Sequence, residues 1–510
     1  MLFLVQDGSL NDTMGQMAGN AMNGLSVLGS LFLFVIGVLV AITIVLFLID
    51  VTQTKDAVRR NYPVIGRFRS LFSKLGEFFR QYFFAMDREE MPFNRAEREY
   101  INDIAEDGHE TVPFGSTKVL TTGASIFANG MFPKLDGEHT PVTPHIIGRQ
   151  ARRPYEPNSF FNISAMSYGS LSKPAVQALS HGAQMAGCWL NTGEGGVSPY
   201  HIEGECDLVY QLGTAKFGAR NDDATLNVSK LRKICEDNPQ IRMIELKLSQ
   251  GAKPGKGGIL PAAKITSEIA NIRGIPKGQD AISPNRHVDA GDVESLLDLI
   301  ELTRETSGLP TGIKFVVGTL KPIHDLFDAI RARGKDSAPD FIALDGGDGG
   351  TGAAPLPLMD NMGLTIRESL PIVHDLLESY DLRDRITIIA AGKLLTPAEV
   401  AWAFCAGADF VNSARGFMFA LGCIQALKCD KNTCPTGITT HNLRLQRGLD
   451  PTNKAVRVMQ YAKTIRKEVE MISHSCGVDH PRHMTRDHVL IVQSDGHAKP
   501  LAQVWDSNAR

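Results

Sequence analysis

The feature that most constrains the fold is a regular alternation of short apolar segments with longer amphipathic ones, which begins after Pro157. The apolar segments include FFNISAM, CWLNTGEGG, IRMIELKLS, TGIKFVVGT, DFIALDGGDGG, ITIIAAGKL and ADFVNSARGF. Buried strands that alternate with helices indicate a parallel sheet, and the length of the region suits a (β/α)8 barrel better than an open sheet. The sequence therefore predicts an α/β fold, a TIM barrel, whose active site lies on the face where the strands end.

A charge-free apolar run from Leu25 to Ile49 precedes this region. It is long enough to cross a hydrocarbon core of about 30 Å as a helix. It lacks the basic leading region of a cleaved signal peptide and is too long for one. Acidic Asp7 and Asp12 lie before it, and six basic residues follow it: Lys55, Arg59, Arg60, Arg67, Arg69 and Lys74. The positive-inside rule therefore predicts a single-pass protein of the inner or plasma membrane, with its N-terminus outside and everything after residue 50 in the cytoplasm.

The segment Val64–Met86 spaces aromatic and basic residues at near-helical intervals. It is compatible with a basic amphipathic helix in the lipid headgroup region, or with a helix that packs its aromatic residues on the main domain. The expected organisation is an external N-terminus (1–24), a transmembrane helix (25–50), a juxtamembrane segment (51–94), the barrel (95–480) and a C-terminal tail (481–510).

Composition excludes several classes of protein. A formal net charge of -3 gives no reason to expect a nucleic-acid partner. Eight cysteines in 510 residues do not form a disulfide scaffold, so they require another explanation.

Three of the cysteines lie close together in GCIQALKCDKNTCPTG, at Cys423, Cys429 and Cys434. Soft thiolates at fixed local spacing suit an iron–sulfur cluster, whereas structural zinc prefers paired C-x2-4-C knuckles. Three ligands fit a three-iron cluster, or a four-iron cluster with a fourth ligand from elsewhere. The alternative is three buried cysteines near a helix end.

The glycine-rich stretch Asp345–Ala354 contains a formal G-x-G-x-x-G at Gly347, Gly349 and Gly352. The residues that follow, APLPLMDNMG, do not form a clean helix, so a dinucleotide fold is not indicated. We interpret the stretch as a loop after a barrel strand whose amides approach a phosphate or a ring. Two later segments place a small-residue turn before a helix, which makes Gly392, Lys393 and Arg415 either candidates for holding a cofactor phosphate or ordinary turn residues with exposed cations.

Six segments in order, NISAMSYGSLS, NTGEGG, LKLSQGAKPGKGG, ISPNRHVD, LDGGDGGTGAAP and the cysteine stretch, resemble the FMN-dependent synthase domain of glutamate synthase. The resemblance covers roughly residues 95–480. It implies a (β/α)8 barrel that binds FMN beside a [3Fe-4S] cluster. The implied oxidoreductase condenses 2-oxoglutarate with ammonia and reduces the resulting 2-iminoglutarate to L-glutamate.

The resemblance also implies roles for individual residues. One group matches the flavin-contacting segments of the family: Ala165, Met166, Ser167, Tyr168, Gly347, Gly349, Gly350, Thr351 and Gly352. Lys314 matches a lysine near the pyrimidine side of the flavin, where a cation stabilises the negative charge of the reduced ring. Cys423, Cys429 and Cys434 match the cluster ligands.

The substrate side follows in the same way. Lys247, Gln250 and Lys253 match the segment that meets the oxo-acid, and Arg273 is the natural bidentate partner for one carboxylate. Glu194 is the candidate for proton transfer at the imine, or else a turn carboxylate bonded to nearby amides.

The chain departs from the large glutamate synthases in two respects that bear on its partners. It has a membrane span where they carry a glutaminase domain, so ammonia is expected from outside the chain. It has no NADPH-binding motif, so a ferredoxin or a separate flavoprotein is the expected electron donor. Two alternatives stay open: an N-methylglutamate synthase-type enzyme that uses methylamine, and a membrane-bound flavin and iron–sulfur module for electron transfer or redox sensing. The oligomeric state is left open.

Overall fold

The computed structural model describes residues 8–53, 56–108, 111–135, 138 and 144–505. The chain divides into two compact units, Met1–Arg95 and Ala96–Arg510. Residues 1–7 of the predicted external segment and the last five residues of the predicted tail lie outside the described part.

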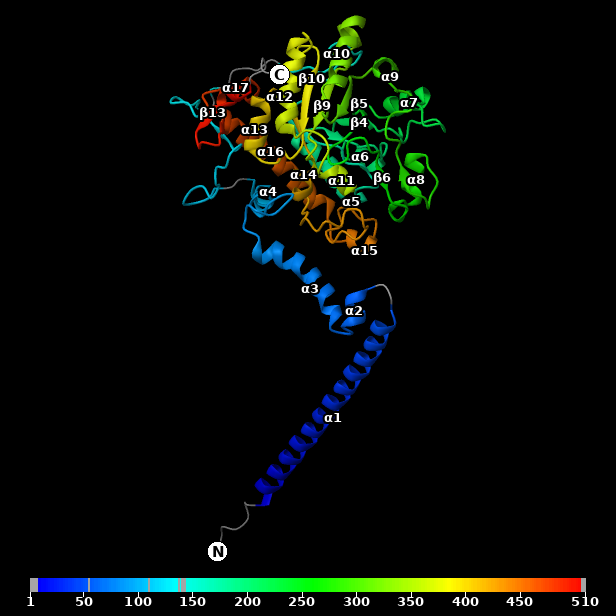
Figure 1. The fold of residues 1–510 in the computed structure, drawn as a ribbon, viewed down its shortest axis with the longest axis vertical. Coiled ribbons are helices and arrows are strands. Elements are labelled where there is room, and N and C mark those ends of the chain that lie inside the picture. Colours follow the sequence, from blue (N-terminus) through cyan, green and yellow to red (C-terminus); the bar gives the residue numbers. More distant parts are fainter. Residues whose placement is uncertain (1–7, 54–55, 109–110, 136–137, 139–143, 506–510) are drawn as a thin grey trace. The chain divides into compact units, whose positions relative to one another are not determined.

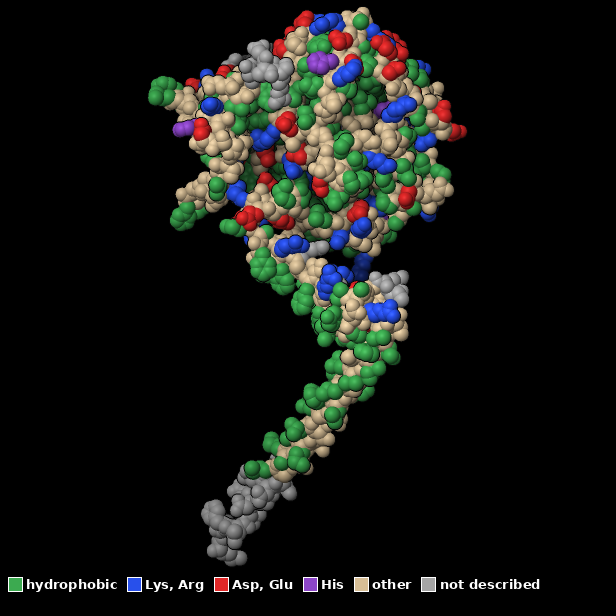
Figure 2. Space-filling model, viewed as in Figure 1, with side chains coloured by type: hydrophobic (Ala, Val, Ile, Leu, Met, Phe, Trp, Pro, Cys, Tyr) green, Lys and Arg blue, Asp and Glu red, His purple; other side chains and the backbone are tan. Residues whose placement is uncertain are grey.

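The first unit consists of helices: α1 (Gly8–Thr52), α2 (Ala57–Asn61), α3 (Gly66–Phe79) and the π-helical turn η1 (Arg80–Phe84). Within α1, Met14–Thr52 is long and apolar enough to cross a membrane, a test that a signal sequence near an N-terminus also passes. Figure 2 shows apolar side chains along this helix.

The end of α1 is hydrogen-bonded to the start of α3. Asp50, which is buried, accepts hydrogen bonds from Arg67 Nε at 2.8 Å and Nη2 at 2.7 Å, and from the Val64 amide at 2.9 Å. The predicted amphipathic helix is present as α3, and its aromatic side chains are largely exposed, with Phe72 at 65%.

The second unit is built around a closed barrel of eight parallel strands in sequence order, drawn in Figure 1. These strands are β2 (Phe161–Ile163), β3 (Leu190–Asn191), β4 (Leu208–Leu212), β5 (Ile241–Lys247), β8 (Thr311–Phe315), β9 (Phe341–Asp345), β10 (Thr387–Ala391) and β11 (Phe410–Ser413). The last strand closes on the first, with Val411 opposite Phe161 and Ser413 opposite Ile163. The predicted (β/α)8 barrel is confirmed.

Helices surround the strands: α4 (Arg95–Asp107), α5 (Lys173–Ala186), α6 (Pro199–Ile202), α7 (Val228–Asp237), α8 (Ser267–Arg273), α9 (Val293–Ser307), α10 (Lys321–Arg333), α11 (Leu356–Met359), α12 (Ile366–Ser379), α13 (Pro397–Cys405), α14 (Arg415–Ala420), α15 (Leu443–Gln446), α16 (Pro451–Ser475) and α17 (Leu501–Val504). Local signals set their ends; α5 starts at the Ser172 cap and stops at Gly187, whose φ is 68°. α5 and α16 can pack closely because Gly182 has no side chain; a Cβ there would lie 2.5 Å from Val458 Cβ.

A long connection between β5 and β8, residues 248–310, departs from the simple alternation; we call it the β5–β8 excursion. It contains the antiparallel pair β6 (Ile259–Leu260) and β7 (Ala281–Ile282), the short turn η2 (Ala262–Lys264), and helices α8 and α9. Its residues supply part of the pocket described below.

The segment after residue 480, expected as a tail, is folded. Its strands β12 (Val489–Val492) and β13 (Ala498–Pro500) pair with each other, and β12 pairs with β1 (Ser125–Phe127). The short turns η3 (Lys335–Ser337), η4 (Pro481–His483) and η5 (Arg486–His488) complete the unit.

Candidate active site

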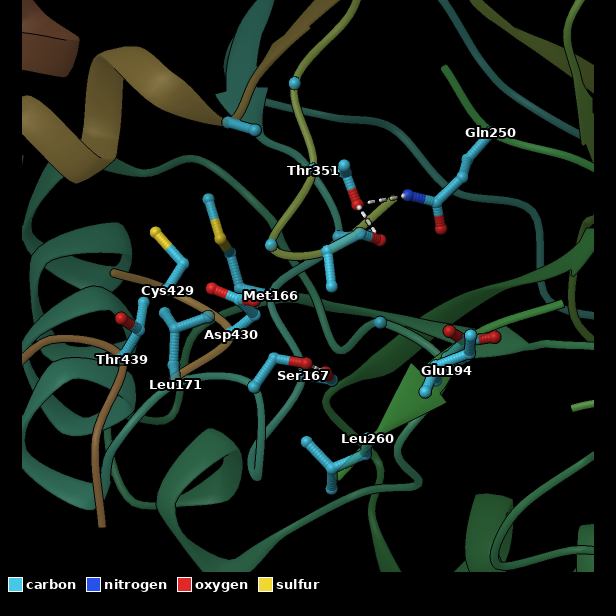
Figure 3. A pocket seen from close by; sticks show the side chains of 18 of the residues that line it. Met166, Ser167, Leu171, Glu194, Gln250, Leu260, Thr351, Cys429, Asp430 and Thr439 are labelled. Carbon is cyan, nitrogen blue, oxygen red and sulfur yellow. Dashed lines mark hydrogen bonds between the residues drawn. The ribbon is translucent and has the colours of Figure 1, made fainter. Parts of the chain in front are cut away.

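A pocket with an empty volume of about 930 Å³, including its open mouth, lies where the barrel strands end (Figure 3). Many of the predicted site residues line it: Ala165, Met166, Ser167, Glu194, Lys247, Gln250, Gly350, Thr351, Gly352, Arg415 and Cys429. In Figure 3, Cys429 and Thr439 lie on one side of the pocket, and Glu194 and Gln250 on the other. The strand ends thus bring the predicted flavin, substrate and cysteine segments to one pocket.

The other predicted residues are not among those that line the pocket: Tyr168, Arg273, Lys314, Gly347, Gly349, Gly392, Lys393, Cys423 and Cys434. Tyr168 and Gly349 lie next in sequence to lining residues, and Lys314 pairs in register with Lys247, which lines the pocket.

Lys247, the last residue of β5, forms the central polar contact of the pocket. Its Nζ lies 2.8 Å from Glu194 Oε2 and donates to Gln250 Oε1 at 2.8 Å. Gln250 in turn donates to Thr351 Oγ1 at 3.3 Å. The chain therefore links the substrate-side residues to the glycine-rich loop.

Glu194 sits in a space that glycine leaves open, because a Cβ on Gly258 would lie 1.9 Å from its Oε1. Burial opposes its negative charge, but Lys247 and, with smaller effects, Lys253 and Arg273 hold the pKa of Glu194 below its usual range. Its Oε2 is the oxygen that faces Lys247 Nζ at 2.8 Å. Glu194 is thus an ionised carboxylate paired with Lys247.

Two lysines of the β5–β8 excursion, Lys253 and Lys264, are buried and have no ion pair with a carboxylate in the described part of the chain. Lys253 Nζ donates to Ala353 O at 3.2 Å, and Lys264 Nζ donates to Ser170 O at 2.7 Å and Cys429 O at 3.3 Å. Burial lowers the pKa of each to about 8. The pocket therefore contains buried positive charge that the protein itself does not neutralise.

Inside the barrel, Lys314 on β8 is buried next to Asp345 at the end of β9, with Nζ 3.3 Å from Oδ2. Burial opposes its charge, but Asp345 and Glu245 raise the pKa of Lys314 above its usual value. Glu245 is buried and accepts bonds from Asn191 Nδ2 at 3.0 Å and Gln211 Nε2 at 2.6 Å. This group forms a fixed charged layer beneath the pocket.

Tyr168 and Arg273 are directed elsewhere than the sequence suggested. The Tyr168 hydroxyl donates to Glu268 Oε2 at 2.6 Å, so it does not line the pocket. Arg273 donates from Nη2 to Tyr168 O at 3.3 Å, and its guanidinium lies 5.0 Å from the centre of the Phe217 ring. A Cβ on Gly195 would lie 2.9 Å from Arg273 Nη2. Arg273 therefore supports the loop that carries Glu194 from outside the cavity.

The glycine-rich loop is close-packed from Gly346 to Gly350 and open at Gly352. A Cβ on Gly251 would lie 2.3 Å from Gly346 O, and one on Gly350 would lie 2.8 Å from Arg415 Nε. Arg415 Nη2 donates to Thr351 O. Backbone amides and a guanidinium at one pocket edge fit the chemistry of a flavin phosphate. Lys393 is turned away, with its Nζ 3.9 Å from Asp348 Oδ2.

The three clustered cysteines lie in an irregular loop that follows α14. Gln425 and Leu427 both have positive φ, at 54° and 52°, which costs energy for a residue with a side chain. Burial raises the pKa of Cys423; burial also acts on Cys434, but hydrogen bonds from Thr436 and Thr439 bring its pKa below the usual value.

Among the described residues, no group of three or more His, Cys, Asp or Glu side chains is close enough to hold a single metal ion. An iron–sulfur cluster keeps its ligand sulfurs farther apart than one ion does, and the donor set here consists of thiols. Cys423, Cys429 and Cys434 therefore fit a cluster in chemistry, and their role as ligands stays a prediction.

Several pocket residues were not predicted: Gln211, Lys264, Met418, Asp430 and Thr439. Gln211 was detectable in principle, because it is an amide side chain inside an otherwise apolar strand, LVYQL. Lys264 had no such signal, since PAAKIT is an ordinary loop sequence.

A protein-family model described as a conserved region in glutamate synthase matches residues 132–479 of this chain. A glutamate synthase large subunit-like protein, YerD of Bacillus subtilis, is 38% identical over 510 residues, covering 92% of this chain and 96% of that protein. The archaeal-type glutamate synthase (NADPH) of Thermotoga maritima is 33% identical over 320 residues, which are 62% of this chain and 59% of its own length.

Two solved structures show a distant likeness. A chimera of (S)-mandelate dehydrogenase has a TM-score of 0.45 at 13% identity, over 77% of this chain and 90% of that one. The flavin-binding domain of baker's yeast flavocytochrome b2 has a TM-score of 0.44 at 15% identity, over 77% and 78%. Neither is close enough to bear on function. The family match and the similarity to YerD confirm the resemblance: the chain belongs to the glutamate synthase family of oxidoreductases acting on CH–NH2 donors.

Proposed function

We propose that this chain is an FMN- and iron–sulfur-dependent glutamate synthase-like enzyme that converts 2-oxoglutarate to L-glutamate, with ammonia from outside the chain. Ammonia and the oxo-acid lose water to form 2-iminoglutarate, which then takes up two electrons and two protons. Family membership supports the reaction class, and one observation in the pocket supports the substrate class: buried lysines without carboxylate partners.

A dicarboxylate supplies the negative charge that this pocket lacks. Lys253 and Lys264 are buried with only carbonyl oxygens as partners, a state that costs free energy until an anion binds. Lys247 and Gln250 offer further donors at the same cavity. We assign one carboxylate of 2-oxoglutarate to Lys253 and Gln250. The carbon that reacts would then lie on the side of Lys247 and Glu194.

Glu194 manages the proton in this proposal. Because its pKa is lowered, Glu194 is a carboxylate in the free enzyme. It therefore first accepts a proton, or a hydrogen bond from an N–H group, and does not donate a proton. Lys247 keeps it ionised and is positioned by Gln250. Arg273, which lies behind the loop, is a positioning residue and not a direct carboxylate clamp.

The cofactors have matching residues. The residues that would hold FMN are Ala165, Met166, Ser167, the tip Gly350–Gly352 and Arg415. Lys314 would supply a fixed cation for the negative charge of the reduced ring. Cys423, Cys429 and Cys434 would hold the [3Fe-4S] cluster. When bound, FMN supplies the hydride for the imine carbon, and the cluster passes it single electrons.

The electron donor and the location are proposed on the sequence. A ferredoxin or a separate flavoprotein is the expected donor, because the G-x-G-x-x-G stretch belongs to a barrel loop and not to a dinucleotide fold. We propose that α1 spans the inner or plasma membrane once, with residues 1–24 outside and the barrel of residues 95–480 in the cytoplasm, as the charges around α1 indicate.

The decisive experiment mixes anaerobically photoreduced protein with 2-oxoglutarate and ammonium, and follows reoxidation of the flavin absorbance together with glutamate formed. We expect reoxidation with ammonium. Reoxidation with methylamine alone would identify an N-methylglutamate synthase-type enzyme. No reoxidation with either amine would favour the electron-transfer module. A protein that binds neither flavin nor iron would contradict all three.

The cluster assignment has its own test. The variant Cys429→Ala should lose the iron content and the electron paramagnetic resonance signal of the cluster. Cys405→Ala is the matched control, because Cys405 is buried in α13 and does not line the pocket. Iron retained in Cys429→Ala, or lost equally in Cys405→Ala, would contradict the assignment.

A further inference from the structure

Lys264, in the short turn η2, lies between two loops of the candidate active site. Its Nζ donates to Ser170 O at 2.7 Å and to Cys429 O at 3.3 Å. Ser170 follows the predicted flavin-contacting segment 165–168, and Cys429 is the second of the three clustered cysteines. Lys264 is 3% exposed and lines the pocket together with both partners. One ammonium group therefore joins the predicted flavin side of the pocket to the predicted cluster side.

A second contact fixes the turn η2 against the cysteine loop, residues 423–434. Asn432 Nδ2, from this loop, donates to Ala263 O at 3.1 Å. The Oδ1 atom of Asn432 accepts a hydrogen bond from the His441 amide at 2.7 Å, so its side chain is held from both sides. Two neighbouring residues of η2 are thus bonded to the cysteine loop, and they set the position of the Lys264 ammonium beside Cys429.

The charge of Lys264 is left for the cysteines. In the described part of the chain it forms no ion pair with a carboxylate; Asp430, next to Cys429 in sequence, pairs with Lys431 Nζ at 2.9 Å instead. Burial lowers the pKa of Lys264, and Cys429 and Cys434 are the strongest of the influences that oppose this effect. A buried cation in this position gains free energy when negative charge is placed at these two sulfurs.

Lys253, the other unpaired lysine, belongs to a different part of the pocket. Its Nζ donates to Ala353 O at 3.2 Å, in the glycine-rich loop. Burial lowers its pKa, and the carboxylate that opposes this effect is Glu194. Figure 3 shows Cys429 on one side of the pocket and Glu194 on the other. The two lysines therefore have different anions within reach, the oxo-acid for Lys253 and the cysteine sulfurs for Lys264.

We propose that Lys264 is the counter-ion of the iron–sulfur cluster, a positioning residue whose charge raises the reduction potential of the cluster and which does not bind 2-oxoglutarate. The proposal rests on the cofactors of the proposed function. One-electron reduction adds one negative charge at the cysteine loop, and a buried cation nearby stabilises the reduced form more than the oxidised form. Lys264 thus favours the uptake of electrons from the donor.

The test uses the full chain, purified anaerobically in nonionic detergent, as wild type and as three variants. K264M removes the charge at similar side-chain length, K264R keeps the charge, and K253M removes the other unpaired lysine. A redox titration followed by electron paramagnetic resonance gives the midpoint potential of the cluster. Reoxidation of photoreduced protein at varied 2-oxoglutarate, with ammonium present, gives the apparent affinity for the oxo-acid.

We expect K264M to shift the reduction equilibrium of the cluster about tenfold toward the oxidised form, which lowers the midpoint potential by ~59 mV for one electron. K264R should restore most of the wild-type potential, and K253M should leave the potential unchanged. The apparent affinity for 2-oxoglutarate should fall in K253M and stay unchanged in K264M.

A variant that loses its cluster is also informative. If K264M retains no iron, K264Q takes its place, because its amide can still donate to Ser170 O without carrying charge. Loss of iron from both neutral variants, with iron retained in K264R, would show that the cluster needs the charge and would support the proposal. Loss of iron from K264R as well would show that Lys264 only shapes the loop, which would overturn it.

Two further outcomes would overturn the proposal and leave the proposed function intact. One is an equal midpoint potential in the wild type and in the neutral variant. The other is a lower affinity for 2-oxoglutarate in K264M without a change of potential, which would make Lys264 a substrate ligand. A wild-type chain without iron is a different result, because it would contradict the proposed cluster and the role of Lys264 with it.

Discussion

Two kinds of buried lysine lie in or beneath the pocket, and they come from different parts of the barrel unit. Lys247 and Lys314 stand on strands β5 and β8, and each has a carboxylate within 3.3 Å or less. Lys253 and Lys264 stand on the β5–β8 excursion and have only carbonyl oxygens as partners. The pKa of Lys314 is raised, whereas burial lowers the pKa of Lys253 and Lys264. The lysines on the strands are thus neutralised by carboxylates of the protein. The lysines on the β5–β8 excursion are not, and they can pair with an anionic ligand.

The largest effect should come from breaking a neutralised pair. Lys247→Met leaves Glu194 buried without its nearest cation, and we expect the free energy of unfolding to fall by about 3–5 kcal/mol. Urea unfolding of the barrel in the absence of oxo-acid measures it. Lys253→Met is the matched control and should cost little, because it removes a desolvated cation with no anion left behind. Equal losses in the two variants would remove the distinction between the two kinds of lysine.

The next effect concerns substrate. If Lys253 binds a carboxylate of 2-oxoglutarate, Lys253→Met should raise KM for 2-oxoglutarate by about 30- to 160-fold, the effect of losing a charged hydrogen bond of about 2–3 kcal/mol. Steady-state kinetics at varied oxo-acid checks this, and Lys253→Arg should restore part of the affinity. An unchanged KM would assign the available charge to something other than the substrate.

A third expectation is a pH dependence of stability. The folded pKa of Lys253 and Lys264, about 8, lies below the ordinary 10.5, so the unfolded chain binds more protons between these values. The free energy of unfolding should therefore rise from pH 8 to pH 10.5, by on the order of 2 kcal/mol per lysine relative to Lys253→Met/Lys264→Met. Parallel stability profiles of the wild type and the double variant would contradict the lowered pKa values.

The smallest effect is expected at Lys393, which was a candidate phosphate ligand. Its Nζ is 3.9 Å from Asp348 Oδ2 and its side chain is outside the pocket. Lys393→Ala should change the unfolding free energy by less than about 0.5 kcal/mol and leave FMN retention, measured by flavin fluorescence after gel filtration, unchanged. Arg415→Ala, at the pocket edge, is the contrasting variant and should release flavin. Equal retention in both would leave the phosphate site unassigned.

The sequence predicted the barrel and the segments of the site, but not which side chains enter the cavity. Strand and helix alternation depends on local periodicity, so β2 to β11 were foreseeable. Tyr168 and Arg273 show the limit, because their directions depend on Glu268 and Phe217, which are distant in sequence. Lys247 and Lys253 are equally charged on paper, and only the fold gives one of them a carboxylate. The strand topology confirmed the fold and the family match confirmed the reaction class, while the residue roles stay predictions.

Barrel closure has a consequence for how this protein is made. The contact of Val411 with Phe161 joins segments about 250 residues apart, so β2 has no neighbour on that side until β11 has been synthesised. At ~5–20 residues per second, a ribosome leaves that strand edge open for roughly 10–50 s. The nascent chain therefore passes through a long interval in which an apolar edge is exposed to other chains. Expression yield should respond more to chaperone supply and translation speed than the stability of the finished barrel suggests.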